Sequence, residues 1–336
     1  MKHYMGLDAG ATKTFCLISD ANGNIKGFGR GGNGNYENQG VEPAARENRK
    51  AVEGALQDAG LALNDIACVG MGIAGADLPE DFDMLEREIY TPLFGETHRV
   101  FRNDSMAAMR GSVRTSHGIV IACGTGVICA GINAQGREAR AGGLNEEFGD
   151  LWTGTIIGRH GLYAVYHARD GIRPPTLLTQ LFVNKAGCRD VEEFFYKMYR
   201  HQLSLDDLQP MAKLVFDAAL QGDAAAVDIL RTAGRYLGDM VLAVARKLDM
   251  TAQPFELVTA GSVFKGSSPV LKDHMMARVH EASPLAVAVT PVFEPVVGAL
   301  LMALETDIDI TDSMYENLTD NLQQAETRYN VEFAAK

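Results

Sequence analysis

Short apolar runs alternate with amphipathic segments along most of the chain. The first run, from Tyr4, leads through a carboxylate and a glycine-bearing turn into a second run, residues 15–18, and this pattern predicts a β-hairpin. Apolar residues spaced by three and four predict a helix over about 43–59. The alternation continues with a buried strand over 66–75, a helix over about 80–90, a strand over 99–104 and a helix over 105–111. This order predicts an α/β domain with a mixed sheet.

The pattern then restarts. Residues 118–132 again give a strand, a glycine turn and a strand, and 133–136 close a hairpin as 20–23 did. The repetition predicts an internal duplication, in which two domains of one topology turn their hairpin tips toward a shared cleft. We expect one lobe from residues 1–114 plus about 296–336, and the other from 115–295. Later elements are a helix over about 223–248, a strand over 255–260 and an apolar helix over about 296–305.

The tail after Glu305 is acidic. We interpret it as a solvated helical extension; the alternative is a dimerisation arm, which would make the protein a homodimer.

Composition narrows the class of protein. At 336 residues and 46% hydrophobic content, the chain can form two cores. A net charge of −12 argues against nonspecific nucleic-acid binding and against docking to anionic membranes. No apolar run reaches membrane-spanning length, and the N-terminus has no signal-peptide region. Five scattered cysteines are most simply reduced and buried, as in a cytoplasmic protein.

The first turn carries candidate phosphate chemistry. Gly10 allows close approach of the backbone to an anion, while Thr12 and Thr14 add hydroxyls and Lys13 adds a positive charge. Asp8 is positioned to hold a metal ion or its water. The same residues would also suit an ordinary hairpin with a glycine turn.

Three such strand–turn units follow one another: Asp8 to Thr14, then Cys123 to Gly126, then Ala260 to Ser262. This arrangement resembles the actin, sugar-kinase and Hsp70 superfamily. Within it, the chain is similar to N-acetylglucosamine kinases and the BadF/BadG/BcrA/BcrD ATPases. The resemblance covers Tyr4 to about Leu304 and implies two actin-like (ribonuclease H-like) α/β domains with mixed sheets and a nucleotide cleft between them.

The resemblance also implies roles for individual residues. Asp8 would lie near Mg²⁺, and Asp104 would take the proton from the attacking sugar hydroxyl. The β- and γ-phosphates of ATP would contact the first turn, and a second phosphate turn and an adenosine turn would follow. The residues implied for the nucleotide are Gly10, Thr12, Lys13, Thr14, Gly124, Thr125, Gly126, Gly261 and Ser262, and those implied for the sugar are Asn35, Gly143 and Asp150.

Each of these residues also has a structural alternative. Asp104 precedes a helix and would serve as its N-cap. Asp150 would be a loop carboxylate, and Lys13 a solvated turn residue. The asparagine-rich loop around Asn35 suits either sugar hydroxyls or a turn cluster, and Gly261 with Ser262 would simply end a strand.

The chain departs from the family pattern in the sugar loop. Leu144 replaces an aromatic residue, Leu151 stands where an acidic residue is expected, and Glu37 also occupies an aromatic position. We therefore expect an ATP-dependent kinase that phosphorylates N-acetylglucosamine, a glucosamine-like sugar or a related hexose. The alternative is an ATPase that activates a partner enzyme through a cysteine-held iron–sulfur cluster, although packing is the simpler role for Cys123 and Cys129.

Overall fold

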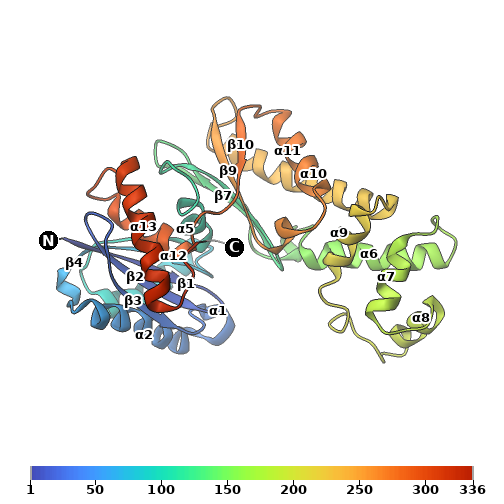
Figure 1. Cartoon of the computed structure of the whole chain (residues 1–336), viewed down its shortest axis with the longest axis horizontal. Coiled ribbons are helices and arrows are strands. Elements are labelled where there is room, and N and C mark those ends of the chain that lie inside the picture. Colours follow the sequence, from blue (N-terminus) through green and yellow to red (C-terminus); the bar gives the residue numbers. More distant parts are fainter. Residues whose placement is uncertain (1, 335–336) are drawn as a thin grey trace. The chain divides into compact units, whose positions relative to one another are not determined.

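The protein, described by a computed structural model over residues 2–334, divides into two compact units (Figure 1). The first comprises Met1–Val120, Ala134–Gly136 and Val289–Lys336, and the second comprises Ile121–Asn133 and Arg137–Ala288. Their sheets have five strands each, in the orders β3-β2-β1-β4-β5 and β10-β9-β6-β7-β8. Read from β8, the second order repeats the first, since a three-strand meander is followed by two later strands. The predicted duplicated α/β architecture is therefore confirmed.

The first sheet begins with the predicted hairpin. β1 (His3–Ala9), β2 (Thr14–Asp20) and β3 (Ile25–Gly31) are antiparallel, while β4 (Ile66–Ile73) runs parallel to β1 and β5 (Arg99–Asn103) runs parallel to β4. Asp8 pairs with Phe15 and Ala9 with Thr14, which leaves residues 10–13 as the hairpin tip. The parallel strands end at this same edge of the sheet.

Helices cover both faces of the first sheet. α2 (Val41–Ala59) packs directly on β3, because Gly29 has no side chain that would collide with the Ala51 carbonyl. α2 begins two residues before the start predicted at about residue 43. The other helical segments of this unit are α1 (Tyr36–Gln39), η1 (Leu63–Asp65), α3 (Pro79–Leu85), η2 (Glu86–Tyr90), α4 (Thr91–Phe94), α5 (Asp104–Arg110), α12 (Pro295–Leu304) and α13 (Asp312–Tyr329).

The acidic tail is helical, as predicted, but its interpretation as a solvated extension was wrong. α13 buries Tyr315, Leu318, Leu322 and Ala325 against the face of the first sheet that α12 also covers. Figure 1 shows this red C-terminal helix beside the blue N-terminal strands. The acidic residues occupy the outer side of an amphipathic helix, so charge alone gave a misleading picture of it.

The second unit also combines a sheet with helices. The strands of the second sheet are β6 (Gly118–Cys123), β7 (Val127–Ile132), β8 (Glu138–Gly142), β9 (Phe255–Ala260) and β10 (Ala286–Val289), of which β6 and β10 cross the boundary between the units. Its helical segments are η3 (Glu146–Phe148), α6 (Gly154–Arg169), α7 (Leu177–Lys185), α8 (Val191–Tyr199), α9 (Met211–Leu220), α10 (Ala224–Lys247), η4 (Ser262–Lys265) and α11 (Val270–His280).

The cysteines lie mostly inside the two units. Cys16, Cys68, Cys123 and Cys129 are buried free thiols, and Cys188 is half-buried. Burial raises the pKa of the Cys123 thiol to about 12, so this sulfur is held in its neutral form. Within residues 2–334, no helix combines the length and apolar character needed to cross a bilayer.

Candidate active site

The hairpin tip between β1 and β2 is a tight, internally bonded turn. The Gly10 amide donates to the Lys13 carbonyl at 3.0 Å, and the Gly34 amide donates to the Gly10 carbonyl at 2.9 Å. Thr12 is exposed at the tip. Thr14 is fully buried instead, and its hydroxyl donates to the Gly32 carbonyl at 2.9 Å, which fastens the chain after β3 to the hairpin. Thr12 is therefore the hydroxyl available to a ligand, whereas Thr14 fixes the shape of the turn.

Lys13 is not a freely solvated residue. Its Nζ lies 2.5 Å from Glu294 Oε2 and 4.4 Å from the centroid of the Phe15 ring. Glu294 immediately precedes α12, so the pair ties the hairpin tip to the helix that supports the sheet. A phosphate approaching Lys13 would compete with Glu294 for the ammonium group.

Two carboxylates lie close enough in the first unit to influence each other. Asp8, at the end of β1, is 6% exposed, and burial raises its pKa to about 8, with a further contribution from the charge of Asp104. Burial also raises the pKa of Asp104 to about 6, although the amide of Ser105 opposes the shift. Carboxyl groups with raised pKa values are typical of catalytic sites, because structural carboxylates are usually paired or solvated.

The capping alternative for Asp104 is not what the structure shows. Asn103 is the N-cap of α5, and its Oδ1 accepts from the Ser105 amide at 3.0 Å. Asp104 is the first residue of the helix and stands half-buried beside the end of β5. Its carboxylate is thus not needed to cap α5.

Polar side chains from neighbouring loops surround this strand end. Asn35 is 6% exposed and caps α1 by accepting from the Glu37 amide at 2.9 Å, and its side-chain amide donates to Glu37 at 3.3 Å. Asn103 donates to Asp77 at 3.1 Å. The charges of Asp77 and Glu37 both raise the pKa of Asp104. The first unit therefore gathers amides and carboxylates, the groups that recognise sugar hydroxyls, around Asp104.

The second unit brings together the other two glycine turns. The Gly124 amide donates to the Gly126 carbonyl at 2.8 Å, and the Gly154 amide donates to the Gly124 carbonyl at 2.7 Å. Gly261 has φ +95°, and a Cβ there would collide with the Cys123 carbonyl. Glycine is therefore required for both conformation and space, and it allows the turn after β9 to lie directly against the turn after β6.

A cavity of about 390 Å³ opens where these turns meet. Gly124 and Thr125 line one side, Ser262 and Gly266 another, and α9 supplies the remaining wall. On α9, Asp217 accepts from Lys213 at 2.6 Å and from Ser267 at 2.9 Å. The cavity thus combines the exposed Thr125 of a glycine turn, a cation and a polar loop, which suits a phosphorylated nucleoside.

The loop expected to contact the sugar is shaped by Asp150. This carboxylate is 4% exposed and accepts from the amides of Gly143 at 3.0 Å and Leu144 at 2.6 Å. Trp152 follows with φ 64°, an unusual conformation for a bulky residue, and its ring stacks on His160 at 4.5 Å between centroids. Asp150 therefore fixes the loop backbone, and its oxygens already serve the loop's own amides.

Asp8 is the residue best suited to a magnesium ion. Among residues 2–334, no three His, Cys, Asp or Glu side chains cluster as a ligand set. Mg²⁺ in nucleotide sites needs only one or two carboxylates, because phosphates and water complete its shell. A buried carboxylate whose pKa is raised to about 8 would be stabilised in its ionised form by such a cation, so the donor set fits.

Sequence reasoning missed three contributors to these sites. Glu294 pairs with Lys13, Asp77 contacts the strand end before Asp104, and α9 forms one wall of the second-unit cavity. None carries a local motif. Their placement depends on packing between segments distant in sequence, which apolar periodicity does not specify.

The two duplicated sheets with glycine turns at their strand ends define an actin-like sugar-kinase fold. A solved structure of a proposed N-acetylglucosamine kinase from Chromobacterium violaceum shares this fold, with a TM-score of 0.64 and 23% identity over 90% of this chain and 99% of that one. The BadF/BadG/BcrA/BcrD ATPase family model matches residues 5–303, and the chain belongs to this family.

Relatives with assigned activities are similar over most of their length. The N-acetyl-D-glucosamine kinase of Dictyostelium discoideum is 28% identical over 90% of this chain and 98% of its own. The N-acetylmuramic acid/N-acetylglucosamine kinase of Clostridium acetobutylicum is 29% identical over 78% and 86%, respectively. Both are sugar kinases, as the sequence resemblance predicted.

Proposed function

We propose that this protein is an ATP-dependent kinase that transfers the γ-phosphate to a hydroxyl of an amino sugar, with N-acetylglucosamine and glucosamine-like sugars as the first candidates. The relatives named above support the amino-sugar class. The observation that carries the proposal is Asp104, a carboxyl group at a strand end that is not needed as a helix cap and whose pKa is raised to about 6. Such a group is ionised at neutral pH yet basic enough to accept a hydroxyl proton.

Asp104 would act on the acceptor. Its carboxylate would orient the sugar hydroxyl and take its proton as the oxygen attacks the γ-phosphorus. Phosphoryl transfer depends mainly on such positioning and on charge stabilisation. Asn35, Gly143 and Asp150 would hold the sugar, Asn35 through its amide and the other two through the loop that Asp150 keeps in shape.

The turns would hold the nucleotide. In the first unit, Gly10, Thr12 and Lys13 would contact the phosphates, with Thr14 keeping the turn in shape and Asp8 holding Mg²⁺. Magnesium would neutralise phosphate charge. In the second unit, the turn 124–126 would contact phosphate, and Gly261 with Ser262 would lie against the adenosine in the cavity that α9 completes. A cytoplasmic location, where ATP is available, is part of the proposal.

The test is ADP formation by the purified chain with Mg²⁺ and ATP, in the presence and absence of N-acetylglucosamine, glucosamine, N-acetylmuramic acid or glucose. We expect ADP release that depends on an amino sugar, together with a phosphorylated sugar in equal amount. Turnover of ATP that is independent of every sugar would instead favour the partner-activating ATPase. Omitting Mg²⁺ should abolish the sugar-dependent turnover.

A further inference from the structure

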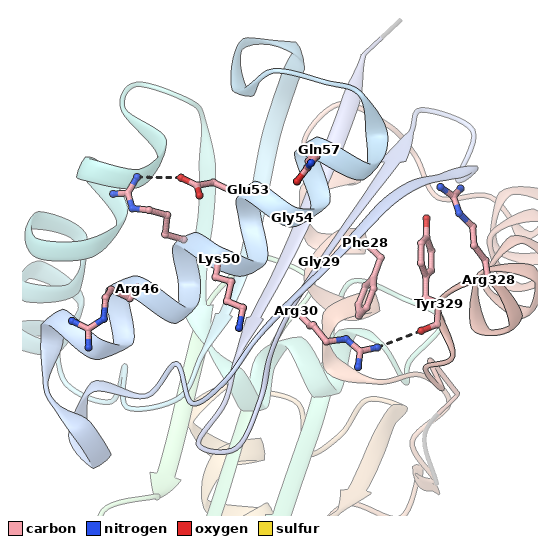
Figure 2. A pocket seen from close by; sticks show the side chains of 11 residues that line it. Phe28, Gly29, Arg30, Arg46, Lys50, Glu53, Gly54, Gln57, Arg328 and Tyr329 are labelled. Carbon is pink, nitrogen blue, oxygen red and sulfur yellow. Dashed lines mark hydrogen bonds and ion pairs between the residues drawn. The ribbon is translucent and has the colours of Figure 1, made fainter.

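The first unit carries a second, open groove outside the residues assigned to phosphoryl transfer. Its volume is about 740 Å³, and it follows the outer edge of β3 with α2 on one side and α13 on the other (Figure 2). β3 is the edge strand of its sheet. None of the residues proposed to bind ATP, Mg²⁺ or the sugar lines it.

The groove is strongly basic. Five cationic side chains line it: Arg30, Arg46, Arg49, Lys50 and Arg328. Among the described residues, Glu53 is the single carboxylate that lines it. They come from β3, α2 and α13. Because the whole chain has a net charge of −12, this concentration of positive charge in one concave site needs an explanation beyond solubility.

Three of these cations have no anionic partner among the described residues, and one of the three, Arg30, donates to the Tyr329 carbonyl at 3.3 Å. Arg49 lies 3.8 Å from Glu53, and Arg328 lies 2.9 Å from Asp58. By contrast, Arg46 and Lys50 are exposed on α2 and form no ion pair with any residue of the described chain. They are four residues apart, which places them on the same face of the helix, about 6 Å from each other at Cβ. Both side chains are long and exposed, so both can turn toward an anion in the groove.

The edge of β3 along the groove is poorly suited to pairing with another strand. The Phe28 amide on β3 donates to Asp58 at 3.1 Å, and the Gly32 amide just after the strand donates to Glu47 at 2.6 Å. An added strand would need these edge amides as donors. A ligand in the groove would therefore be recognised by side chains, with guanidinium and ammonium groups as the main donors.

We propose that this groove binds a small metabolite carrying two or more phosphoryl charges. Guanidinium groups pair with phosphate oxygens in two-point geometry, and a lysine adds a point charge. The volume is typical of small-ligand sites. Tyr329 beside Arg328 supplies an aromatic side, and Gln57 and Glu53 supply acceptors for hydroxyl groups of the ligand. Arg46 and Lys50 provide charges that form no ion pair within residues 2–334.

The experiment is calorimetric titration of the full chain with inorganic pyrophosphate in metal-free buffer at about 0.15 M salt. The groove variant is Arg46→Gln combined with Lys50→Gln, and glutamine preserves helix propensity at both exposed sites. The matched control is Arg173→Gln with Lys185→Gln, two exposed cations of the second unit. A swapped variant, Arg46→Lys with Lys50→Arg, keeps both charges. Any binding to the ATP phosphate site is common to all four proteins, so differences among them report on the groove.

We expect the groove variant to bind pyrophosphate at least about tenfold more weakly than the wild type, or to lose one of two sites. The control should match the wild type, and the swapped variant should stay within about threefold. Equal binding by the wild type and the groove variant would overturn the proposal, as would an equal loss in the control. A parallel titration with hexaglutamate tests a peptide ligand: binding that depends on the groove and is tighter than that of pyrophosphate would also overturn it.

Discussion

Replacing Asp104 by Asn should separate catalysis from stability. Asparagine has nearly the same shape but cannot accept a proton, so we expect kcat to fall by a factor of about 10²–10⁴, which corresponds to about 3–5 kcal/mol in the barrier. ATP binding should be retained, because the carboxylate acts on the acceptor. In the wild type, a pKa of about 6 leaves this carboxylate mostly ionised at pH 7 and mostly protonated at pH 5. The value of kcat/KM should therefore fall about tenfold between these two pH values.

The same substitution should stabilise the unliganded protein. The pKa of Asp104 rises from its ordinary value of 3.8 to about 6 on folding. The folded chain therefore binds this proton more tightly than the unfolded chain does. The contribution of Asp104 to the free energy of unfolding is thus lowest above pH 6 and increases as pH falls toward 3.8. At about 1.4 kcal/mol for each pH unit, the ionised carboxylate costs about 3 kcal/mol at pH 7. Screening at this half-buried position reduces the expected gain to about 1–3 kcal/mol.

Denaturant unfolding at pH 7 and at pH 4, combined with steady-state kinetics, tests both parts. Asn103→Ala is the matched control, because it removes the cap of α5 and should lower the unfolding free energy by about 1 kcal/mol while leaving the carboxylate present. If Asp104→Asn were less stable than the wild type at pH 7, the burial argument would be wrong. If it kept kcat within tenfold, the assigned base would be wrong.

Three further substitutions test other parts of the structure. Gly261→Ala should destabilise the second unit by at least about 2 kcal/mol more than Gly149→Ala, since both have φ near +95° but a Cβ collides with backbone only at Gly261; comparable losses of unfolding free energy would contradict this. Leu318→Ala, at a fully buried position of α13, should cost about 2–5 kcal/mol in a denaturant titration, while Asp320→Ala on the exposed side should change stability by less than about 0.5 kcal/mol. Lys13→Met should raise the KM for ATP about tenfold and leave the KM for the sugar unchanged, and an equal effect on both would show that the lysine only supports the fold.

The sequence was sufficient to predict the elements with strong local signals. The hairpin from Tyr4, the strand predicted over 99–104 (observed as Arg99–Asn103) and the helix of about 223–248 all appear, because apolar periodicity and glycine turns are determined over a few residues. The duplication could also be predicted, since the second hairpin repeats the first. The convergence of the turns at Thr125 and Ser262 on one cavity follows from the order of the strands within the second sheet.

What the sequence could not provide depends on packing between distant segments. The acidic residues of the tail concealed the apolar face of α13, which becomes evident only when Leu318 and Leu322 are placed against the sheet. Similarly, no local signal links Lys13 with Glu294, which are separated by most of the chain. The capping alternative for α5 named Asp104, whereas Asn103 is the cap; both are good capping residues, and only the backbone geometry distinguishes them.

The two units contribute different kinds of chemistry. In the first, burial raises the pKa values of the Asp8 and Asp104 carboxyl groups, because water would solvate their ionised forms better than the protein interior does. Carboxyl groups in such unfavourable positions are typical of functional sites, where a bound ligand offsets the cost of burying the charge. In the second, the turns at Gly124 and Gly261 pack closely against each other, and the charged groups of the cavity, Lys213, Asp217 and Lys265, come from α9 and η4. Under the proposed function, the first unit would supply the carboxyl groups that act on a proton and a cation together with one phosphate-binding turn, while the second would supply the glycine turns and the cavity for the rest of the nucleotide. Substitutions of Asp8 and Asp104 should accordingly alter pH dependence, whereas those of the turn residues in either unit should alter nucleotide affinity.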